Sequence, residues 1–155
     1  MPVTEPSDLK DITLLGRSTQ PTKKLEAFPN RSPGRYYLVT LETDEFTCLC
    51  PVTGQPDFAH IRVQYVPDEK VVESKSFKLY LWSYRNEGAF HEHVVNRILD
   101  DLVAVLDPHW MRVTGVFNIR GGIGITVEAE RTRTEAARSQ WLQTSPKDQS
   151  TDGEV

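Results

Sequence analysis

The sequence predicts an α+β domain in which two helices cover one face of a four-stranded antiparallel sheet. Four segments alternate apolar and polar residues, a pattern typical of strands with one face in the core and one toward solvent. Between the second and third of these segments, apolar residues recur at helical spacing. The predicted order is therefore strand, strand, helix, helix, strand, strand.

Each predicted strand has a recognisable core face. The first strand covers Tyr36 to Glu42, a run rich in Tyr, Leu, Val and Thr, which favour strands. The core-facing positions expected in the other three are Ile61, Val63 and Tyr65, then Met111, Val113, Gly115 and Phe117, then Ile123, Ile125 and Val127. The opposite face is expected to carry Arg62, Gln64, Thr114, Thr126 and Glu128.

Two helices are predicted between the strand pairs. The first runs over about residues 75–84, and the second runs from about residue 89 to the pair Asp107-Pro108, because proline disfavours helical backbone at the residue before it. The apolar stripe of the second helix consists of Phe90, Val94, Val95, Ile98, Leu99, Leu102 and Leu106. Ahead of both helices, residues 47–57 contain prolines and a glycine and predict a loop.

A chain of 155 residues fits one folded domain with a single core. Residues 1–34 are polar and rich in proline, which predicts an extended N-terminal arm. Residues 35–131 form the predicted domain. Residues 132–155 are polar and predict a mobile C-terminal tail.

Composition and charge argue against several classes of partner. The chain has 18 basic and 22 acidic residues for a net charge of −4, without the basic stripe of a nucleic-acid surface. No apolar run approaches the roughly 20 residues that cross a bilayer. Residues 1–5 lack the basic start and apolar stretch of a secretory signal. We therefore expect a cytoplasmic protein with no membrane partner and no direct nucleic-acid partner.

The chain has two cysteines, Cys48 and Cys50. A disulfide between residues so close in sequence would strain the backbone, so no disulfide framework is expected. Two free thiols agree with a reducing cytosol.

Cys50 and Asp57 are the first candidates for chemistry. Cys50 follows a predicted strand in a loop of prolines and glycine, where a sulfur is accessible and the backbone is fixed. Asp57 lies seven residues on, between Pro56 and Phe58, which could partly desolvate its carboxyl. A thiol and a carboxyl brought together can act as nucleophile and acid/base. Spacing alone favours a plainer alternative, a small buried hydrophobe and a turn-forming aspartate.

The start of the first predicted helix could bind an anion. Glu73 and Ser74 could form its N-cap region, where free amides hold an anion or the polar edge of a ring. Lys75 and Lys78 are three residues apart on one helix face and could grip a phosphate. An ordinary solvated helix start explains the same composition.

The start of the second predicted helix carries Glu92, within the segment Phe90 to His93. A carboxylate can accept two parallel hydrogen bonds from the ring N–H and the exocyclic amine of a guanine-type ring, so Glu92 suits a purine-like ligand. An acid favoured by the helix dipole is the alternative. Gly121 to Gly124 form a hairpin turn and not a dinucleotide fingerprint, so a nicotinamide cofactor would need another binding device.

The stretch from Tyr36 to Glu128 resembles the 7-cyano-7-deazaguanine reductase family, the nitrile reductases of queuosine biosynthesis. The family signature Glu-Ser-Lys-Ser-hydrophobic-Lys-Leu-Tyr reads here as Glu73 through Tyr80 without a mismatch. The loop from Leu49 to Asp57 and the pair His91-Glu92 also agree with the family in spacing.

This resemblance implies the tunnelling fold (T-fold), whose subunits assemble into oligomeric barrels with active sites at subunit interfaces. The short, single-domain form implies a decamer of two stacked pentamers. The implied reaction reduces the nitrile of 7-cyano-7-deazaguanine to the amine of 7-aminomethyl-7-deazaguanine with two NADPH, through a covalent cysteine thioimide, in the pathway to a tRNA modification.

The resemblance also implies roles for individual residues. Cys50 would be the nucleophile and Asp57 the proton donor, with no metal. The substrate would be bound by Val72, Glu73, Ser74, His91 and Glu92. Contacts to the cofactor phosphates would come from Lys75, Lys78 and Arg120. Cys48 has no assigned role and is expected to be structural.

Two alternatives remain open at this point. The first is a zinc-dependent pterin or purine cyclohydrolase of the same fold, with Cys48, Cys50, His91 and His93 as ligands. The second is a purine-binding module that keeps the fold without the chemistry. The presence of both a thiol and a carboxyl in the loop argues against this second alternative.

Overall fold

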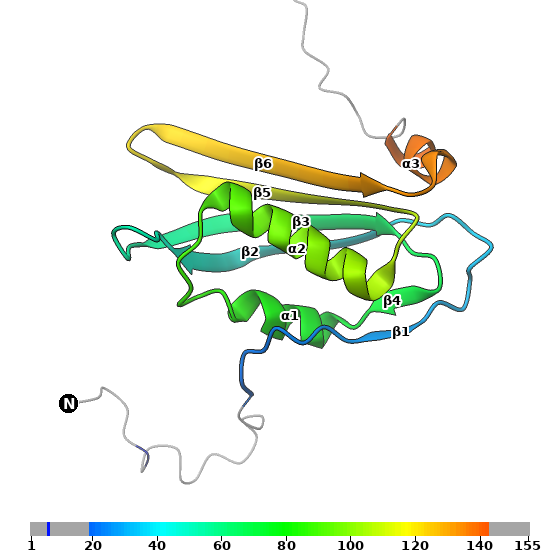
Figure 1. Cartoon of the computed structure of the whole chain (residues 1–155), viewed down its shortest axis with the longest axis horizontal. Coiled ribbons are helices and arrows are strands. Elements are labelled where there is room, and N and C mark those ends of the chain that lie inside the picture. The colour runs from blue at the N-terminus through cyan, green and yellow to red at the C-terminus, as the bar shows by residue number, and fades with distance from the viewer. Residues whose placement is uncertain (1–5, 7–18, 143–155) are drawn as a thin grey trace, which may run out of the picture.

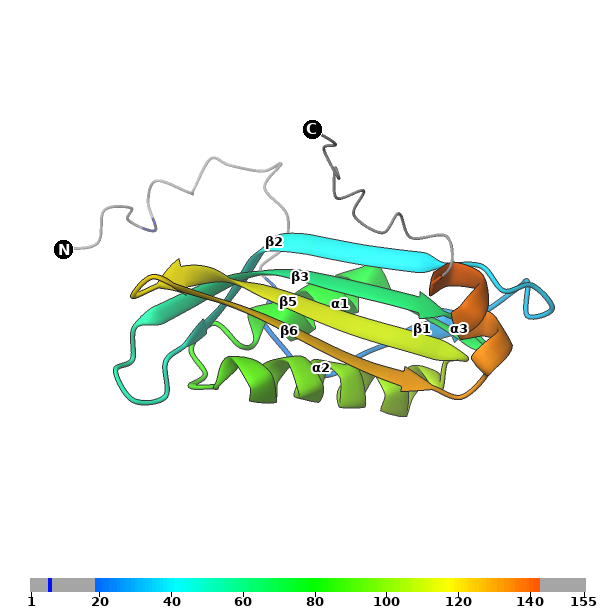
Figure 2. The same cartoon turned by 90° about the horizontal axis from the view of Figure 1, so that it is seen from above.

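The computed structural model describes residue 6 and residues 19–142, and it confirms the α+β class (Figure 1). A four-stranded antiparallel sheet has the order β2-β3-β5-β6. Its strands are β2 (Val39–Leu49), β3 (Pro56–Val66), β5 (Trp110–Arg120) and β6 (Ile123–Thr132). Both long helices lie on one face of this sheet, as Figure 2 shows from above. They are α1 (Ser74–Trp82) and α2 (His91–Leu106).

The main core lies between the sheet and these two helices. On β3, the alternate residues Ile61, Val63 and Tyr65 are buried, as the apolar alternation predicts. Helix α2 buries its apolar stripe from Val94 to Leu106 against β5 and β6. Each fully buried aliphatic side chain contributes about 1.5–3 kcal/mol relative to an exposed one, so this stripe fixes α2 on the sheet. Two expectations are wrong: Phe90 is the exposed N-cap before α2, and Ile123, beside the β5–β6 turn, is also exposed.

The β2–β3 hairpin is longer than the sequence predicts. Strand β2 begins at Val39 instead of Tyr36 and continues to Leu49, and β3 starts at Pro56. The expected loop over residues 47–57 is therefore confined to residues 50–55. Pairing of Cys48 with Asp57 across the hairpin extends the ladder that far.

A second, two-stranded sheet joins the N-terminal arm to the domain. Strand β1 (Ala27–Pro29) pairs antiparallel with β4 (Lys70–Val72), which leads directly into α1. The Glu73 N–H also donates to the Glu26 carbonyl at 2.8 Å. The arm predicted over residues 1–34 thus includes a strand that supports the start of α1. Residues 1–5 and 7–18 of that prediction lie outside the described residues.

The predicted C-terminal tail begins with a helix, α3 (Glu135–Leu142). Ala137 of α3 is fully buried and forms a small second core with Val66 and Trp110, joined by Trp141 and Leu142. The Gln140 amide and the Trp141 indole both donate to the Tyr36 carbonyl, at 3.0 and 3.3 Å. The apolar face of α3 is too narrow to stand out in a polar segment. Residues 143–155 lie outside the described part of the chain.

None of the described helices combines the length and the apolar character needed to cross a membrane.

Gly115 lies where β5 passes closest to α2. A Cβ at this position would come within 2.7 Å of Val95 Cγ2 and 3.0 Å of Phe117 Cε2. We expect Gly115→Ala to lower the free energy of unfolding by about 1–3 kcal/mol, because overpacking a filled core forces strain. Urea denaturation measures this change. Gly34→Ala is the control, since its Cβ would meet nothing within 4 Å. Equal stability of the two variants would contradict the close packing of α2 on β5.

Candidate active site

Cys50 lies on a tight turn at the end of β2. Its N–H donates to the Gln55 carbonyl at 2.8 Å, and its own carbonyl accepts from the Gly54 N–H at 2.9 Å. Gly54 has a φ of +69°, a conformation that glycine adopts without steric cost. The turn therefore holds a half-buried, free thiol on a fixed backbone.

The two cysteines differ in their electrostatic surroundings. A hydrogen bond from the Thr53 hydroxyl, followed by backbone N–H groups of Thr53 and Val52, lowers the pKa of Cys50, and the charge of Arg120 adds to this effect. Burial, followed by the nearby Asp57 carboxylate, raises the pKa of Cys48 to about 11. Cys50 is thus suited to react as a thiolate, whereas Cys48 is a neutral part of the core.

Asp57 is the buried acid of this region, with 4% of its surface exposed. One carboxylate oxygen, Oδ1, accepts from Arg120 Nη1. The other, Oδ2, lies 3.3 Å from His91 Nε2. A buried carboxylate needs such partners, because burying an unpaired charge costs several kcal/mol.

His91 is the first residue of α2, and its ring is fixed from two sides. The ring stacks on Phe117 of β5, with 3.8 Å between ring centroids and 8° between the planes. Its Nε2 faces Asp57, and its side chain is 15% exposed. The start of α2 is therefore tied both to β5 and to the acid of β3.

Arg120 approaches from the last residue of β5. Besides Asp57, its guanidinium donates through Nη2 to Gln55 Oε1 in the thiol turn. The β2–β3 turn, the β5–β6 turn and the start of α2 all lie at the same end of the molecule (Figures 1 and 2). The structure thus brings together Cys50, Asp57, His91 and Arg120 from four separate parts of the sequence.

The signature segment forms the start of α1, as the sequence predicts. Glu73 is the N-cap, and its carboxylate accepts from the Lys75 N–H at 2.8 Å and the Ser76 N–H at 2.6 Å. These backbone hydrogen bonds lower the pKa of Glu73. Val72, just before it, is buried at the end of β4.

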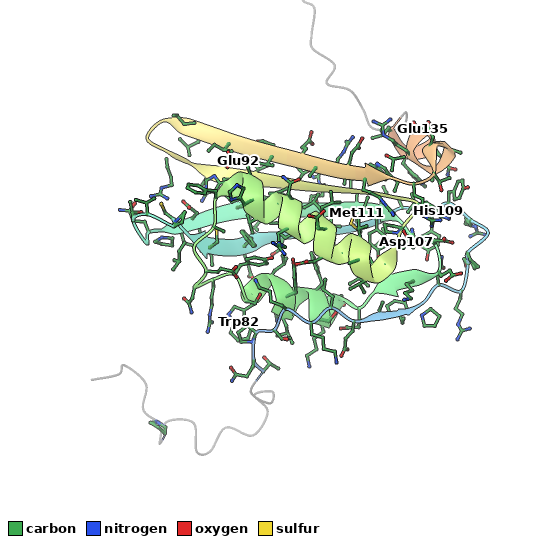
Figure 3. The ribbon with its side chains drawn as sticks, in the orientation of Figure 1. Trp82, Glu92, Asp107, His109, Met111 and Glu135 are labelled. Atoms are coloured by element: carbon green, nitrogen blue, oxygen red, sulfur yellow. The ribbon has the colours of Figure 1, made fainter. Side chains whose placement is uncertain are left out.

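A cleft of about 630 Å³ opens between α1 and β2. Its lining includes Ser74, Lys78, Trp82 and Arg85. Lys75 and Glu92 do not line this cleft. Figure 3 shows Glu92 at the start of α2 and Trp82 near the end of α1, at the same end of the molecule as the thiol turn. Of the residues predicted for the site, Cys50, Asp57, His91 and Arg120 thus lie together, and Ser74 and Lys78 line the cleft. Like Lys75 and Glu92, Val72 and Glu73 are not part of the cleft lining.

Two contributors to the site were not singled out by sequence reasoning. Thr53 has the largest effect on the Cys50 thiol, and the Gln55 side chain links that turn to Arg120. Gln55 lies in the loop from Leu49 to Asp57 that resembles the reductase family, so the resemblance could have identified it as a site residue. No feature of the sequence distinguished Thr53, because threonine is common in turns.

The zinc alternative finds little support in this geometry. Within residues 19–142, no three His, Cys, Asp or Glu side chains converge as a metal-binding group. Cys48, one of the four ligands that alternative needs, is fully buried in the main core.

Comparison with known proteins agrees with the resemblance seen in the sequence. The family model of the QueF-like protein matches residues 56–136. A protein of Syntrophus aciditrophicus named NADPH-dependent 7-cyano-7-deazaguanine reductase is 65% identical over 127 residues, covering 82% of this chain and 91% of the relative. A protein of Thermomicrobium roseum with the same name is 60% identical over 116 residues, covering 75% and 91%.

A solved structure shares the fold. The apo crystal structure of the archaeosine synthase QueF-Like matches with a TM-score of 0.56 and 29% identity, covering 60% of this chain and 91% of that one. Together with the family model, which spans more than half of the chain, these matches confirm the expected family. The chain belongs to the QueF-like protein family.

Proposed function

We propose that this chain is an NADPH-dependent nitrile reductase. It reduces 7-cyano-7-deazaguanine to 7-aminomethyl-7-deazaguanine, a step of queuosine biosynthesis, through a thioimide on Cys50. The relatives' names support the reaction and the cofactor. The observation that carries the mechanism is a thiol of lowered pKa on a rigid turn, joined through Gln55 and Arg120 to a buried carboxylate, Asp57.

The chemistry begins at the sulfur. The Cys50 sulfur attacks the nitrile carbon, and its proton passes to Asp57 and on to the nitrile nitrogen, which leaves a neutral thioimide. NADPH, when bound, would supply the two hydrides, one for this C=N bond and one for the imine that remains once the thiolate has left. The two hydrides carry the four electrons between nitrile and amine, and two protons complete the amine. Covalent attachment holds the substrate between the two reductions.

Substrate binding is assigned to the starts of the two helices. Glu92 is exposed in the first turn of α2, where it can accept from the N–H edge of the deazaguanine ring. Val72 ends β4, Glu73 caps α1 and Ser74 is the first residue of α1, while His91 belongs to the start of α2. Each Glu73 oxygen already accepts one backbone N–H and retains capacity for a second donor.

The cleft beside α1 suits the cofactor phosphates. Its lining holds the cationic Lys78 and Arg85 together with the acidic Glu42 and Glu45, of which Glu42 is paired with Arg62, and Lys75 lies one turn away on α1. Because the Glu73 carboxylate already accepts from the Lys75 and Ser76 N–H groups, a phosphate here would be bound by the charges of the basic side chains. Arg120, also expected at the phosphates, is engaged with Asp57 and Gln55.

We further propose assembly into rings, two pentamers forming a decamer. Within the described sheet, β2 and β6 are edge strands, and the outer side of β2 is paired only at its last residue, where Leu49 forms a bridge to Gly88. The strands have 11 and 10 residues, which is long for exposed edge strands. Proteins normally protect such edges with charges, prolines or bulges, or pair them with another strand. Pairing β2 of one subunit with β6 of the next would close a barrel.

Cys50→Ala is expected to abolish the covalent adduct, because no other thiol can take its place. Intact-mass measurement after mixing protein with 7-cyano-7-deazaguanine tests this, and NADPH oxidation is followed by nicotinamide absorbance. Cys48→Ala is the matched control and should still form the adduct. A normal adduct yield in Cys50→Ala would exclude the assigned nucleophile. Binding of the nitrile by the wild type without any adduct would favour a non-catalytic purine-binding module.

Glu92→Gln is expected to weaken binding of 7-cyano-7-deazaguanine by roughly 10- to 100-fold. A hydrogen bond to a charged group contributes about 1.5–3 kcal/mol, and every 1.4 kcal/mol is tenfold. Titration calorimetry with substrate and with NADPH separates the two ligands. Glu135→Gln on α3 is the control and should change neither affinity. Equal losses for substrate and cofactor would contradict the role given to Glu92.

Thr53→Val is expected to raise the pKa of Cys50, because the hydroxyl is the largest cause of its lowering. The pH at which iodoacetamide alkylation reaches half its maximal rate should therefore move upward. Thr126→Val, a change on the exposed part of β6, is the control. An unchanged alkylation profile in Thr53→Val would remove Thr53 from the account of thiol reactivity.

A further inference from the structure

Arg120 makes two contacts with residues far away in the sequence. Nη1 donates to Asp57 Oδ1 and Nη2 donates to Gln55 Oε1, across 63 and 65 residues. The guanidinium is planar and presents its N–H groups in a fixed fork. One rigid group therefore sets the positions of two side chains relative to each other.

The backbone aims Arg120 at this region. The β5–β6 pairing shifts register between Phe117 and Arg120, and such irregularities redirect the following side chains. The turn that follows consists of Gly121 and Gly122, with φ values of 58° and 77°. Two left-handed residues make a tight hairpin turn, so the base of the Arg120 side chain is held firmly.

Both contacts of Arg120 lead to groups that take part in the proposed chemistry. Asp57 is 4% exposed and is paired with the Arg120 guanidinium, and His91 Nε2 lies 3.3 Å from its other oxygen. Gln55 accepts the Cys50 N–H through its backbone carbonyl, so fixing the Gln55 side chain steadies the thiol turn. The Arg120 side chain is 41% exposed and reaches this position from the surface.

We propose that Arg120 is a positioning residue, which clamps Gln55 and Asp57 together and so sets the geometry of thiol and acid for attack on the nitrile. This inference rests on the proposed function. It assigns Arg120 to the covalent step, whereas a cofactor-phosphate contact would affect only the hydride transfers. Adduct formation in the absence of NADPH therefore distinguishes the two roles, because only a positioning role would change its rate.

The test measures the rate of adduct formation with 7-cyano-7-deazaguanine alone, by intact mass in a rapid-quench series. Arg120→Met should slow this rate roughly 10- to 100-fold, as expected for a misplaced reacting group. The Kd of Arg120→Met for NADPH should stay within about twofold of the wild-type value, a small change in binding free energy. Arg112→Met is the control, since Arg112 lies on the same strand and pairs with Glu130. Normal adduct formation with weakened NADPH binding would overturn the proposal.

Two further variants keep the test decisive if Arg120→Met does not fold. Arg120→Lys keeps the charge but lacks the planar fork that fixes two partners at a set spacing, and Gln55→Met removes one partner while Asp57 stays paired. Both should slow adduct formation, and normal rates in both would overturn the clamp. Because the Arg120 charge lowers the pKa of Cys50, alkylation in Arg120→Met should need a higher pH, while Arg120→Lys should keep the wild-type profile.

Failure of the proposed function gives a different result. A wild-type protein that forms no adduct would overturn the nitrile chemistry, and the clamp for that chemistry with it. A wild type that forms the adduct at the same rate as Arg120→Met would overturn the clamp alone.

Discussion

A carboxylate that is almost entirely removed from water must be neutralised where it stands, and this constraint organises one end of the molecule around Asp57. Its partners come from the end of β5 and the start of α2. Each partner is held in turn, His91 by the face of Phe117 and Arg120 by Gln55. The acid therefore couples three elements and the thiol turn, and a shift of β5 or α2 would remove one of its two partners.

The signature segment serves both the fold and the site. Glu73 caps α1, while Phe77 and Tyr80 of the same segment are core residues. The buried Tyr80 hydroxyl donates to Asp101 at 2.7 Å, which ties α1 to α2. Ser74 and Lys78 line the cleft beside α1, and Phe77 also lies on that lining. A substitution in this segment can therefore change stability, ligand binding or both.

The spacing of apolar residues predicted the main elements well, because a strand or helix with one buried face has apolar residues at regular intervals. The alternation around Val63 and the stripe along α2 are examples. The strand β1 has three residues and α3 a narrow apolar face, so neither leaves a clear period. The contact between Arg120 and Asp57 depends on tertiary structure, and local pattern carries no trace of it. For Cys50 and Asp57, spacing alone favoured the plainer interpretation, and only the family signature pointed to chemistry.

The contrast between the two cysteines also decides how the protein responds to oxidants. A sulfenic acid is rescued when a second thiolate condenses with it to a disulfide. Cys48 is the only other cysteine of the chain, and it is buried and protonated two positions away, so it makes a poor resolving partner. An oxidised Cys50 therefore depends on small thiols such as glutathione for its recovery, and otherwise proceeds to the irreversible sulfinic and sulfonic acids.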